Sequence, residues 1–405
     1  MNDEGEGSVG QVETRIVEVC TGGLTLESGR RLESVEVAYE QYGEIDAERD
    51  NVVLVCHALS GGAHAAGWHP GARKPGWWDN LIGPGKAFDT RKYCVICSNV
   101  LGSCYGTTGP SSAEPATGRP YGSRFPVVTV GDMVTVQKAL LDRLGIRRLL
   151  AVVGGSMGGM QALQWAVACP ASVRSVIAIA SSARHSPQQI AFNEIARRAV
   201  TADPAWSGGD YYGSERPDRG LAVARMIGHV TYLSAGGMER KFGRRAAAPA
   251  PSWTLEPEFE VERYLSHQGR EFADRFDANS LVYLTRAIDY FDLGAGWPSL
   301  TEAFRAARAS FLLLTFSSDW LYPPSQLAEV GRAASDAGRA VEYHEIPSGY
   351  GHDAFLLESE AQTPIIRSWL ERVAEASRQP RVSMPALARS RSSSCIPAGA
   401  GGRGG

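Results

Sequence analysis

A predicted strand-to-helix turn with a serine at its apex constrains the fold of this chain more than any other feature. In LLAVVGGSMGGMQALQW, residues 149–165, an apolar run ends in glycines and is followed by apolar positions at helical spacing. This pattern predicts a buried strand that turns sharply into a helix. Gly154 and Gly158 flank Ser156 in a G-x-S-x-G arrangement, which suits a strained turn because its neighbours need to lack Cβ atoms. Such a short pattern also fits a glycine-rich turn made only for tight packing.

The turn would place the Ser156 hydroxyl where it can act as a nucleophile. It lifts the serine hydroxyl above the edge of the sheet, and the N-terminus of the following helix directs N–H groups toward developing negative charge. Ser156 is therefore our candidate nucleophile.

Composition narrows the classes of partner. The 405 residues are 43% hydrophobic, enough for a sizeable core, and 41 basic and 44 acidic residues leave a net charge of -3. This balance does not favour nucleic acid or an anionic membrane surface, so we expect small-molecule partners. No apolar run reaches 18 residues, and MNDEGEGSVGQVETR lacks the regions of a secretory signal, which predicts a cytoplasmic protein. Seven scattered cysteines predict reduced thiols.

Apolar runs bounded by turns alternate with helical patterns along much of the chain. The runs include NVVLVCHAL, YCVICSNVLG, RLLAVVGG, VRSVIAIASS, SFLLLTFSSD and AVEYHEIPS. One helical pattern follows VVTV, with Gly131 and Asp132 as the expected N-terminal cap and Gly145 as the stop. The alternation predicts an α/β fold with a mainly parallel sheet covered on both faces.

The alternation stops in the middle of the chain, where polar, arginine-rich helices are predicted. We expect these helices to form a cap over the carboxyl edge of the sheet. The predicted organisation is a flexible N-terminus (1–11), a core in two parts (12–183 and 310–376), an inserted helical cap (184–309) and a disordered Ser/Gly/Arg/Pro-rich tail (377–405).

Two later strand ends supply the partners that a serine nucleophile needs. A hydroxyl requires a base, and the base requires a carboxylate that fixes its tautomer. Asp319 is the first acidic residue after SFLLLTFSS, and His352 lies in a glycine-flanked loop after VEYHEIPS. Taken singly, Asp319 also fits a turn and His352 a surface loop. Their order, Ser then Asp then His, is that of α/β-hydrolases.

The remaining histidines fit the base role less well, because they lie inside predicted strands, in the cap or in an early loop. They are His57, His64, His69, His185, His229, His267 and His344. No H-E-x-x-H motif or i, i+4 histidine pair indicates zinc, so we expect neither a metal nor a resident cofactor.

An oxyanion hole needs two backbone donors, one after the nucleophile and one from an early strand-to-helix loop. Met157 N–H is the first candidate. Leu59 N–H in CHALSGG is the second, because the following glycines let the backbone fold close to the acyl carbon.

Several longer motifs, in order along the chain, resemble the homoserine O-acetyltransferase family of α/β-hydrolase-fold enzymes. The resemblance runs from Val12 to Ala376, and small departures occur at LGSC and HALSGG. The motifs are IGPGKAFDT, YCVICSNVLGSCYGTTGPSS, GGSMGGMQALQW, GLAVARMIGHVTYLS, KFGR and RFDANSLVYLTRAIDYFD.

The resemblance implies acetyl transfer from acetyl-CoA, as a co-substrate, to the hydroxyl of L-homoserine in methionine biosynthesis. It assigns the triad to Ser156, Asp319 and His352, and it also implies a homodimer formed through the cap helices. The family's substrate-contacting arginine falls on Arg225 and its acidic contact on Asp353. This pairing suits an amino acid, which presents a carboxylate and an ammonium group. From the residues alone, Arg225 also fits an inter-helix charge pair and Asp353 a helix N-cap.

Related functions stay open at this stage. A carboxylesterase would share the triad, and relatives could use succinyl-CoA or serine. Family members that use succinyl-CoA tend to carry an arginine just after the DW of the acid motif. Leu321 stands there in this chain and cannot pair with a succinyl carboxylate, which favours acetyl. A catalytically silent binding protein is the alternative from a different class, and the intact triad argues against it.

Overall fold

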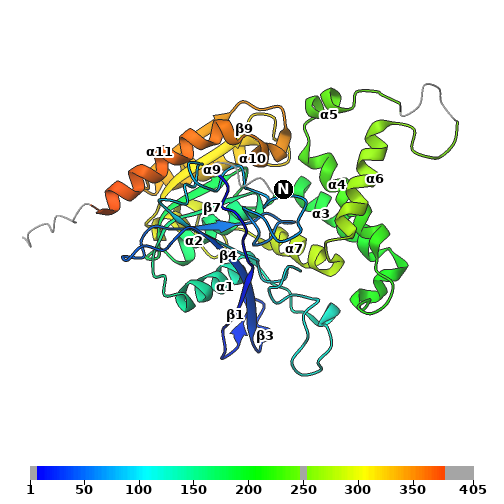
Figure 1. Ribbon diagram of the computed structural model, residues 1–405, viewed down its shortest axis with the longest axis horizontal. Helices are drawn as coiled ribbons and strands as arrows, with labels where there is room; N and C mark the ends of the chain where they lie inside the picture. The colour runs from blue at the N-terminus through cyan, green and yellow to red at the C-terminus, as the bar shows by residue number, and fades with distance from the viewer. Residues whose placement is uncertain (1–6, 247–252, 379–405) are drawn as a thin grey trace, which may run out of the picture.

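The computed structural model describes residues 7–246 and 253–378, and its centre is an eight-stranded sheet (Figure 1). The strand order is β1-β4-β6-β5-β7-β8-β9-β10, and every pairing from β6 to β10 is parallel, whereas β4 is antiparallel to both of its neighbours. The expected mainly parallel sheet is confirmed. The strands are β1 (Arg15–Val19), β4 (Val35–Tyr42), β5 (Val52–Cys56), β6 (Cys94–Ser98), β7 (Leu149–Gly155), β8 (Val173–Ile179), β9 (Ser310–Phe316) and β10 (Val341–Ile346). A small hairpin pairs β2 (Leu24–Thr25) with β3 (Arg31–Leu32).

Both faces of the sheet are covered, as the uninterrupted apolar runs require. Along β5 the side chains alternate between two hydrophobic layers, with Leu54 and Cys56 in one and Val53 and Val55 in the other. The first layer is closed by α1 (Val130–Arg143), α2 (Met157–Ala168) and α9 (Pro324–Asp336). The second is closed by α11 (Ser359–Arg378) together with the long segment that follows β5.

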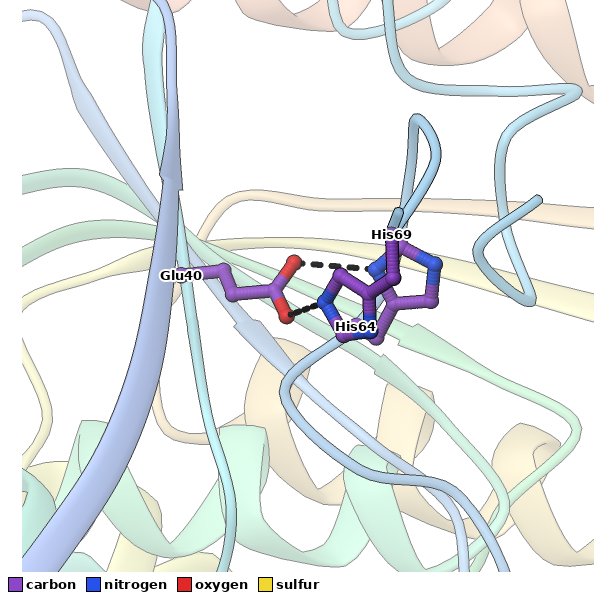
Figure 2. A group of neighbouring side chains, drawn as sticks. All are labelled: Glu40, His64 and His69. Carbon is purple, nitrogen blue, oxygen red and sulfur yellow. Dashed lines mark hydrogen bonds and ion pairs between the residues drawn. The ribbon is translucent and has the colours of Figure 1, made fainter. Parts of the chain in front are cut away.

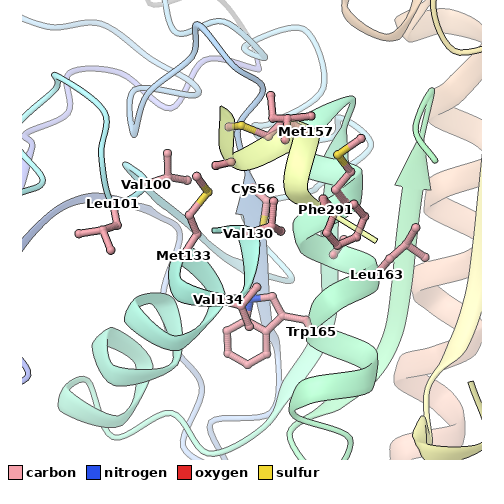
Figure 3. Close-up of a cluster of buried hydrophobic side chains, with 14 of the residues drawn as sticks. Cys56, Val100, Leu101, Val130, Met133, Val134, Met157, Leu163, Trp165 and Phe291 are labelled. Atoms are coloured by element: carbon pink, nitrogen blue, oxygen red, sulfur yellow. The ribbon is translucent and has the colours of Figure 1, made fainter. Parts of the chain in front are cut away.

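A chain of buried hydrogen bonds fixes α2 within the first layer, where Trp165 lies beside Val134 (Figure 3). Trp165 Nε1 donates to Gln137 Oε1 of α1 at 2.8 Å, and Gln137 Nε2 donates to Gln161 Oε1 at 2.7 Å. Gln161 Nε2 in turn donates to the backbone carbonyl of His57, just after β5, at 3.2 Å. Because buried amides need partners, these bonds hold α2 in register with the turn after β5.

The start of α1 differs from the sequence expectation. Thr129, rather than Gly131 or Asp132, is the N-cap, since its side chain accepts from Asp132 N and Asp132 caps the Thr129 N–H in return. Threonine followed three residues later by an acid forms this reciprocal pair, which outweighs the glycine signal. Gly145 lies just beyond the C-cap with φ +73°, as expected for a helix stop.

The helical insertion follows β8. It contains α3 (Pro187–Thr201), α4 (Asp218–Tyr232), α5 (Ala235–Lys241), α6 (Glu260–Ala273), α7 (Ala278–Tyr290) and α8 (Leu300–Ala306), with a short 3-10 helix, η2 (Pro204–Gly209), after α3. In Figure 1, α4, α5 and α6 stand away from the sheet as a separate lobe.

The two ends of the insertion lie side by side. Leu293 N donates to the Ala183 carbonyl at 2.9 Å, and Arg184 and Asp292 form an antiparallel bridge. The helix α8 comes after this closure and packs on the body, where Phe304 meets Phe311 of β9 edge to face. The cap boundary expected at residue 309 therefore includes a helix that belongs to the body by its contacts.

The chain ends fall largely outside the described residues. This applies to most of the expected flexible segment 1–11 and to nearly all of the expected tail 377–405, although α11 continues through residues 377 and 378. Within the described ranges, no helix combines the length and the apolar character needed to cross a membrane.

Candidate active site

Ser156 occupies the apex of the turn between β7 and α2, in a backbone conformation that few residues adopt. Its φ is 57° and its ψ is -125°, far from the regions that L-residues favour. Such strain persists only where the surroundings enforce it, and it is concentrated at functional sites. The turn is held by Ser156 N–H, which donates to the Ile179 carbonyl at 2.9 Å, and by Ser181 Oγ, which donates to the Ser156 carbonyl at 2.8 Å.

The flanking glycines are required because the backbone of the neighbouring strand comes too close for a side chain. A Cβ at Gly158 would lie 2.0 Å from the Cys56 carbonyl oxygen, and one at Gly154 would lie 2.3 Å from the Gly158 backbone. Both separations are far below van der Waals contact. The G-x-S-x-G pattern thus reports a close approach of α2 to the end of β5.

The acid and the base are brought together as predicted from the sequence order. His352 Nδ1 lies 2.8 Å from Asp319 Oδ2, and both side chains are buried. The Tyr322 N–H donates to the other carboxylate oxygen, Asp319 Oδ1, at 2.8 Å. With Asp319 held in this way, His352 carries its proton on Nδ1 and leaves Nε2 available as a base.

Tyr322 lies beside this pair and in the same cavity as the nucleophile. Its ring stacks on the His352 imidazole with centroids 4.8 Å apart, and both Tyr322 and Ser156 line the cavity. The Ser156 hydroxyl is not hydrogen-bonded to His352 in this structure. Serine–histidine bonds of this kind are commonly long without substrate and tighten when it binds.

The predicted oxyanion donors have no competing acceptor. Neither Leu59 N–H nor Met157 N–H donates to any residue that the structure describes. Leu59, Ser60 and Ser156 line the same cavity. A carbonyl oxygen placed between the two N–H groups would therefore find both available.

His57 has a structural role at this loop. Its Nδ1 bonds the Ala58 carbonyl at 2.8 Å, and its Nε2 accepts from Val100 N at 3.0 Å. Burial lowers the pKa of His57 to about 4, so the ring is neutral at pH 7. It braces the oxyanion loop and is not a candidate base.

Arg225 and Asp353, the two residues expected to bind substrate, face one region of the cap and body without pairing to each other. Arg225 Nη1 reaches Ser60 Oγ at 3.3 Å, and its guanidinium lies over the rings of Phe272 and Tyr232 at 4.8 and 5.6 Å. Its Nε is buried and makes no hydrogen bond to a described residue. A planar cation in this setting suits a carboxylate ligand.

The Asp353 carboxylate is likewise uncommitted. It lies at the N-cap position of α10 (Ala354–Leu357) but makes no capping hydrogen bond, and it makes no ion pair within the described ranges. Burial raises its pKa, an effect that the nearby charges of His352, Arg225 and Lys241 partly offset. Asp353 thus occupies the N-cap position, as the alternative interpretation expected, but its carboxylate does not cap the helix.

A second buried histidine–aspartate pair lies beside the triad, and sequence reasoning did not find it as a site. His185 Nε2 lies 2.7 Å from the Tyr322 hydroxyl, and His185 Nδ1 lies 3.2 Å from Asp289 Oδ1. Asp289 is held in turn by Arg197 Nη1 at 2.7 Å and by Asn193 Nδ2 at 2.7 Å. The only sequence signal is that Tyr322 stands three residues after Asp319; the other contacts depend on how the cap folds back.

One further cluster has the composition of a metal site. The ligand atoms of Glu40, His64 and His69 all lie within 4.8 Å of one another, and the two rings converge on the carboxylate (Figure 2). Glu40 already accepts from four donors: His64 at 3.0 Å, His69 at 2.8 Å, Thr14 at 2.7 Å and Tyr42 at 2.8 Å. The cluster therefore holds the loop after Leu59 onto β4 by hydrogen bonds alone. The expectation of a metal-free enzyme stays a prediction.

Comparison with known proteins places this site in a family. The family model described as alpha/beta hydrolase fold matches residues 51–359. The homoserine O-acetyltransferase of Methanohalobium evestigatum is 55% identical over 364 residues, 90% of this chain and 74% of that protein. The homoserine O-acetyltransferase of Deferribacter desulfuricans is 52% identical over 91% of this chain and 98% of that protein.

The chain belongs to the homoserine O-acetyltransferase family of the alpha/beta hydrolase fold.

Solved structures agree and add a second activity among relatives. The homoserine O-acetyltransferase of Bacillus anthracis superposes with a TM-score of 0.84 at 32% identity, covering 89% of this chain and 98% of that one. Esterase E22 superposes with a TM-score of 0.82, also at 32% identity, covering 89% and 100%. Structures named as a homoserine O-acetyltransferase and as an esterase thus share this fold at the same sequence identity.

Proposed function

We propose that this enzyme is a homoserine O-acetyltransferase that moves the acetyl group of acetyl-CoA to the hydroxyl of L-homoserine through an acetyl-serine intermediate. The observation that carries the proposal is the bonded His352–Asp319 pair, which follows Ser156 in the chain order of a triad, in a chain 55% identical to a homoserine O-acetyltransferase over 90% of its length. The uncommitted Arg225 and Asp353 charges beside the triad support an amino-acid acceptor.

In the first half-reaction, His352 Nε2 takes the Ser156 proton as Oγ attacks the thioester carbonyl. The Leu59 and Met157 N–H groups stabilise the oxyanion of the tetrahedral intermediate. The C–S bond then breaks, and His352 returns the proton to the departing CoA thiolate. Asp319 stabilises the transient imidazolium.

In the second half-reaction, the homoserine hydroxyl is the nucleophile. Arg225 holds its carboxylate and Asp353 its ammonium group, while His352 removes the hydroxyl proton as the oxygen attacks the acetyl carbonyl. The Ser156 Oγ–carbonyl bond breaks, and the proton passes from His352 to Ser156. Water competes for the same intermediate, so positioning of homoserine decides between transfer and hydrolysis.

The lining of the cavity supports acetyl as the acyl group. Leu321 lies in the cavity with Ser156 and Tyr322, and its backbone carbonyl accepts from Gln189 of the cap at 2.8 Å. An aliphatic side chain there gives a succinyl carboxylate no partner, and burying that charge alone is costly.

The direct test combines mass spectrometry with one variant. Wild-type enzyme incubated with acetyl-CoA alone should gain one acetyl group on Ser156, and homoserine should discharge it as O-acetylhomoserine. Ser156→Ala should remain folded by circular dichroism, form no adduct and lose transfer. An adduct that persists in Ser156→Ala would assign the nucleophile to another residue.

An esterase is the second candidate, because esterase E22 shares the fold at the same identity as the Bacillus anthracis enzyme. The two functions differ in what discharges the acetyl-enzyme. Release of CoA that depends on homoserine favours the transferase. Release at the same rate without homoserine, together with rapid cleavage of simple acetyl esters, would favour the esterase.

We also propose a homodimer formed through the cap helices. Apolar side chains are exposed on two neighbouring helices of the cap, Ile190 and Ile195 on α3 and Val223 and Val230 on α4. Sedimentation equilibrium on wild type and on Ile195→Glu with Val223→Glu tests this, and a monomeric wild type would contradict it.

A further inference from the structure

The KFGR segment at the end of α5 carries charges that the acyl-transfer mechanism above does not use. Arg240, Lys241, Arg244 and Arg245 place four cations within six residues of a chain whose net charge is negative. Arg245 is neutralised by Glu260, with Nε 2.7 Å from the carboxylate. The other three make no ion pair with any residue of the described ranges.

This basic end of α5 lies beside the loop that carries the candidate base, a place that we call the rim of the site. Arg240 Nη2 donates to the Gly349 carbonyl at 2.9 Å, and Ser234 Oγ at the start of α5 donates to the same carbonyl. Gly349 belongs to the loop that carries His352. The α5 helix is therefore fastened to the base loop.

Lys241 lies near residues of the candidate substrate site. Its Nζ lies 4.0 Å from the centre of the Tyr264 ring, and the Tyr264 hydroxyl bonds His229 Nδ1 at 3.0 Å. The Lys241 charge is close enough to influence both His229 and Asp353. Arg244 extends from the next turn and lies 5.3 Å from the Phe259 ring. Aromatic faces thus direct both side chains while their N–H donors stay open to solvent.

Helix-dipole stabilisation explains only part of this arrangement. Cations at a helix C-terminus are favourable, but the effect fades beyond the last turn, and α5 is only seven residues long. Arg244 lies past its end. Uncompensated cations close together repel one another, so their presence beside the base loop points to an anionic ligand.

We propose that Lys241 and Arg244 bind the phosphate groups of the acyl donor, the nucleoside 3′-phosphate 5′-diphosphate end of acetyl-CoA, while its thioester reaches Ser156. This inference rests on the proposed function. The donor is strongly anionic at one end and neutral at the other. Cations at the rim and neutral N–H groups at Ser156 match that polarity. Arg240 is a positioning residue, because its guanidinium is already bonded to the base loop.

The test compares two donors that share the acetyl thioester and differ in the phosphates. Acetyl-CoA carries the phosphates, whereas S-acetyl-N-acetylcysteamine ends before them. For Lys241→Gln with Arg244→Gln, we expect KM for acetyl-CoA to rise roughly tenfold with kcat retained, and kcat/KM for the short donor to stay at the wild-type value. In wild type, added salt should weaken use of acetyl-CoA and leave the short donor unaffected.

The matched control is Arg219→Gln. Arg219 is an exposed cation at the opposite end of α4, so its loss changes the net charge of the cap without touching the rim. It should leave both donors unchanged. Equal loss with both donors in the double variant, or no change with either, would overturn the phosphate site.

The two proposals fail in different ways. If the wild type were acetylated by the short donor and showed no use of acetyl-CoA, the proposed function would fail. If the wild type used acetyl-CoA and the double variant matched it, only the phosphate site would fail.

Discussion

Arg225 and Asp353 present opposite charges to the substrate side of the triad, and no described residue neutralises either by an ion pair. The half-reactions separate their role from that of Ser156. Arg225→Ala should acetylate Ser156 from acetyl-CoA at close to the wild-type rate, because the role proposed for this guanidinium is to hold the homoserine carboxylate and not the donor. Transfer to homoserine should fall, since a desolvated charge pair of on the order of 2–5 kcal/mol corresponds to roughly 30-fold or more in kcat/KM.

Rapid-quench measurement of each half-reaction checks this. Lysine at the same position should restore only part of the activity, because it lacks the two-pronged donor geometry. Equal damage to both halves would mean that Arg225 supports the structure of the cap.

The buried Asp353 charge should lower the stability of the fold while it serves homoserine binding. Burial raises its folded-state pKa above the unfolded value, so ionisation at neutral pH destabilises the fold. That penalty is absent below the unfolded pKa and complete above the folded one. Asp353→Asn should therefore raise Tm by about 2 °C at pH 7, with the gain vanishing near pH 3, while homoserine use falls. Calorimetry across pH checks the sign; a lower Tm at pH 7 would contradict it.

Single residues were predictable where chemistry and chain order constrain them together. Ser156, Asp319 and His352 each follow a strand in the order that the fold demands, and the structure joins the acid to the base at 2.8 Å. Tyr322 and His185 were not found, because their contact spans the body and the cap. No local pattern encodes which cap residue reaches the acid loop.

Among the elements, the Glu40 carboxylate joins β4 to the loop after Leu59 by hydrogen bonds to His64 and His69. Burial opposes ionisation of Glu40, but hydrogen bonds from His64, Thr14 and Tyr42 outweigh it and lower its pKa to about 2. A depressed carboxylate pKa contributes stability that is present above the unfolded value and is lost as pH falls toward 2. Glu40→Gln should destabilise the fold by about 2 kcal/mol or more at pH 7. The glutamine NH2 group would replace a carboxylate oxygen and face the hydrogen-bond donors that this oxygen now accepts from.

Urea denaturation at pH 7 and pH 3 measures this effect, and the difference between wild type and variant should shrink at the lower pH. Glu342→Gln, which changes a partly exposed carboxylate on β10, is the matched control and should cost little. A Glu40→Gln variant as stable as wild type at pH 7 would remove the anchoring role.

Elements were predictable where periodicity is strong and less so at their ends. The run before Ser156 is a strand buried throughout, as expected. At α1 the glycine suggested a start two residues late, whereas the reciprocal bonds between Thr129 and Asp132 define it. The anchoring of Glu40 could not be foreseen, because it joins positions 24 and 29 residues apart through a loop without a regular pattern.

At the scale of the whole molecule, the boundary of the last helix permits a sharp truncation. Residue 378 ends α11, whose Ile366, Trp369 and Leu370 are buried against the sheet. The composition beyond it is poor in large apolar residues. A stop codon after residue 378 should leave both acyl-transfer rates and Tm unchanged. A truncation at residue 365 is the contrasting control and should unfold the protein. A large loss of activity or Tm on truncation after residue 378 would show that the tail packs on the fold.

The architecture as a whole was largely predictable, since alternating strands and helices leave few options for a parallel sheet. The extent of the cap was harder to predict from the sequence. The sequence pattern changes at residue 309, where the next strand begins, whereas the chain rejoins the body earlier, at Leu293 beside Ala183. Helical periodicity does not distinguish a helix of the lobe from one that covers the body.

The hydrogen bond between Ala183 and Leu293 makes residues 184–292 an insertion whose two ends lie side by side. Because its two ends already touch, an exchanged segment of different length would meet little loop-closure entropy, and the body would keep its own strands and triad. Transplanting residues 184–292 between this enzyme and an esterase of the same fold would then move Arg225, the proposed carboxylate contact, while Asp353 stays with the body. The hydrogen bond between Leu293 and Ala183 therefore marks the two positions at which one insertion would replace another in this family.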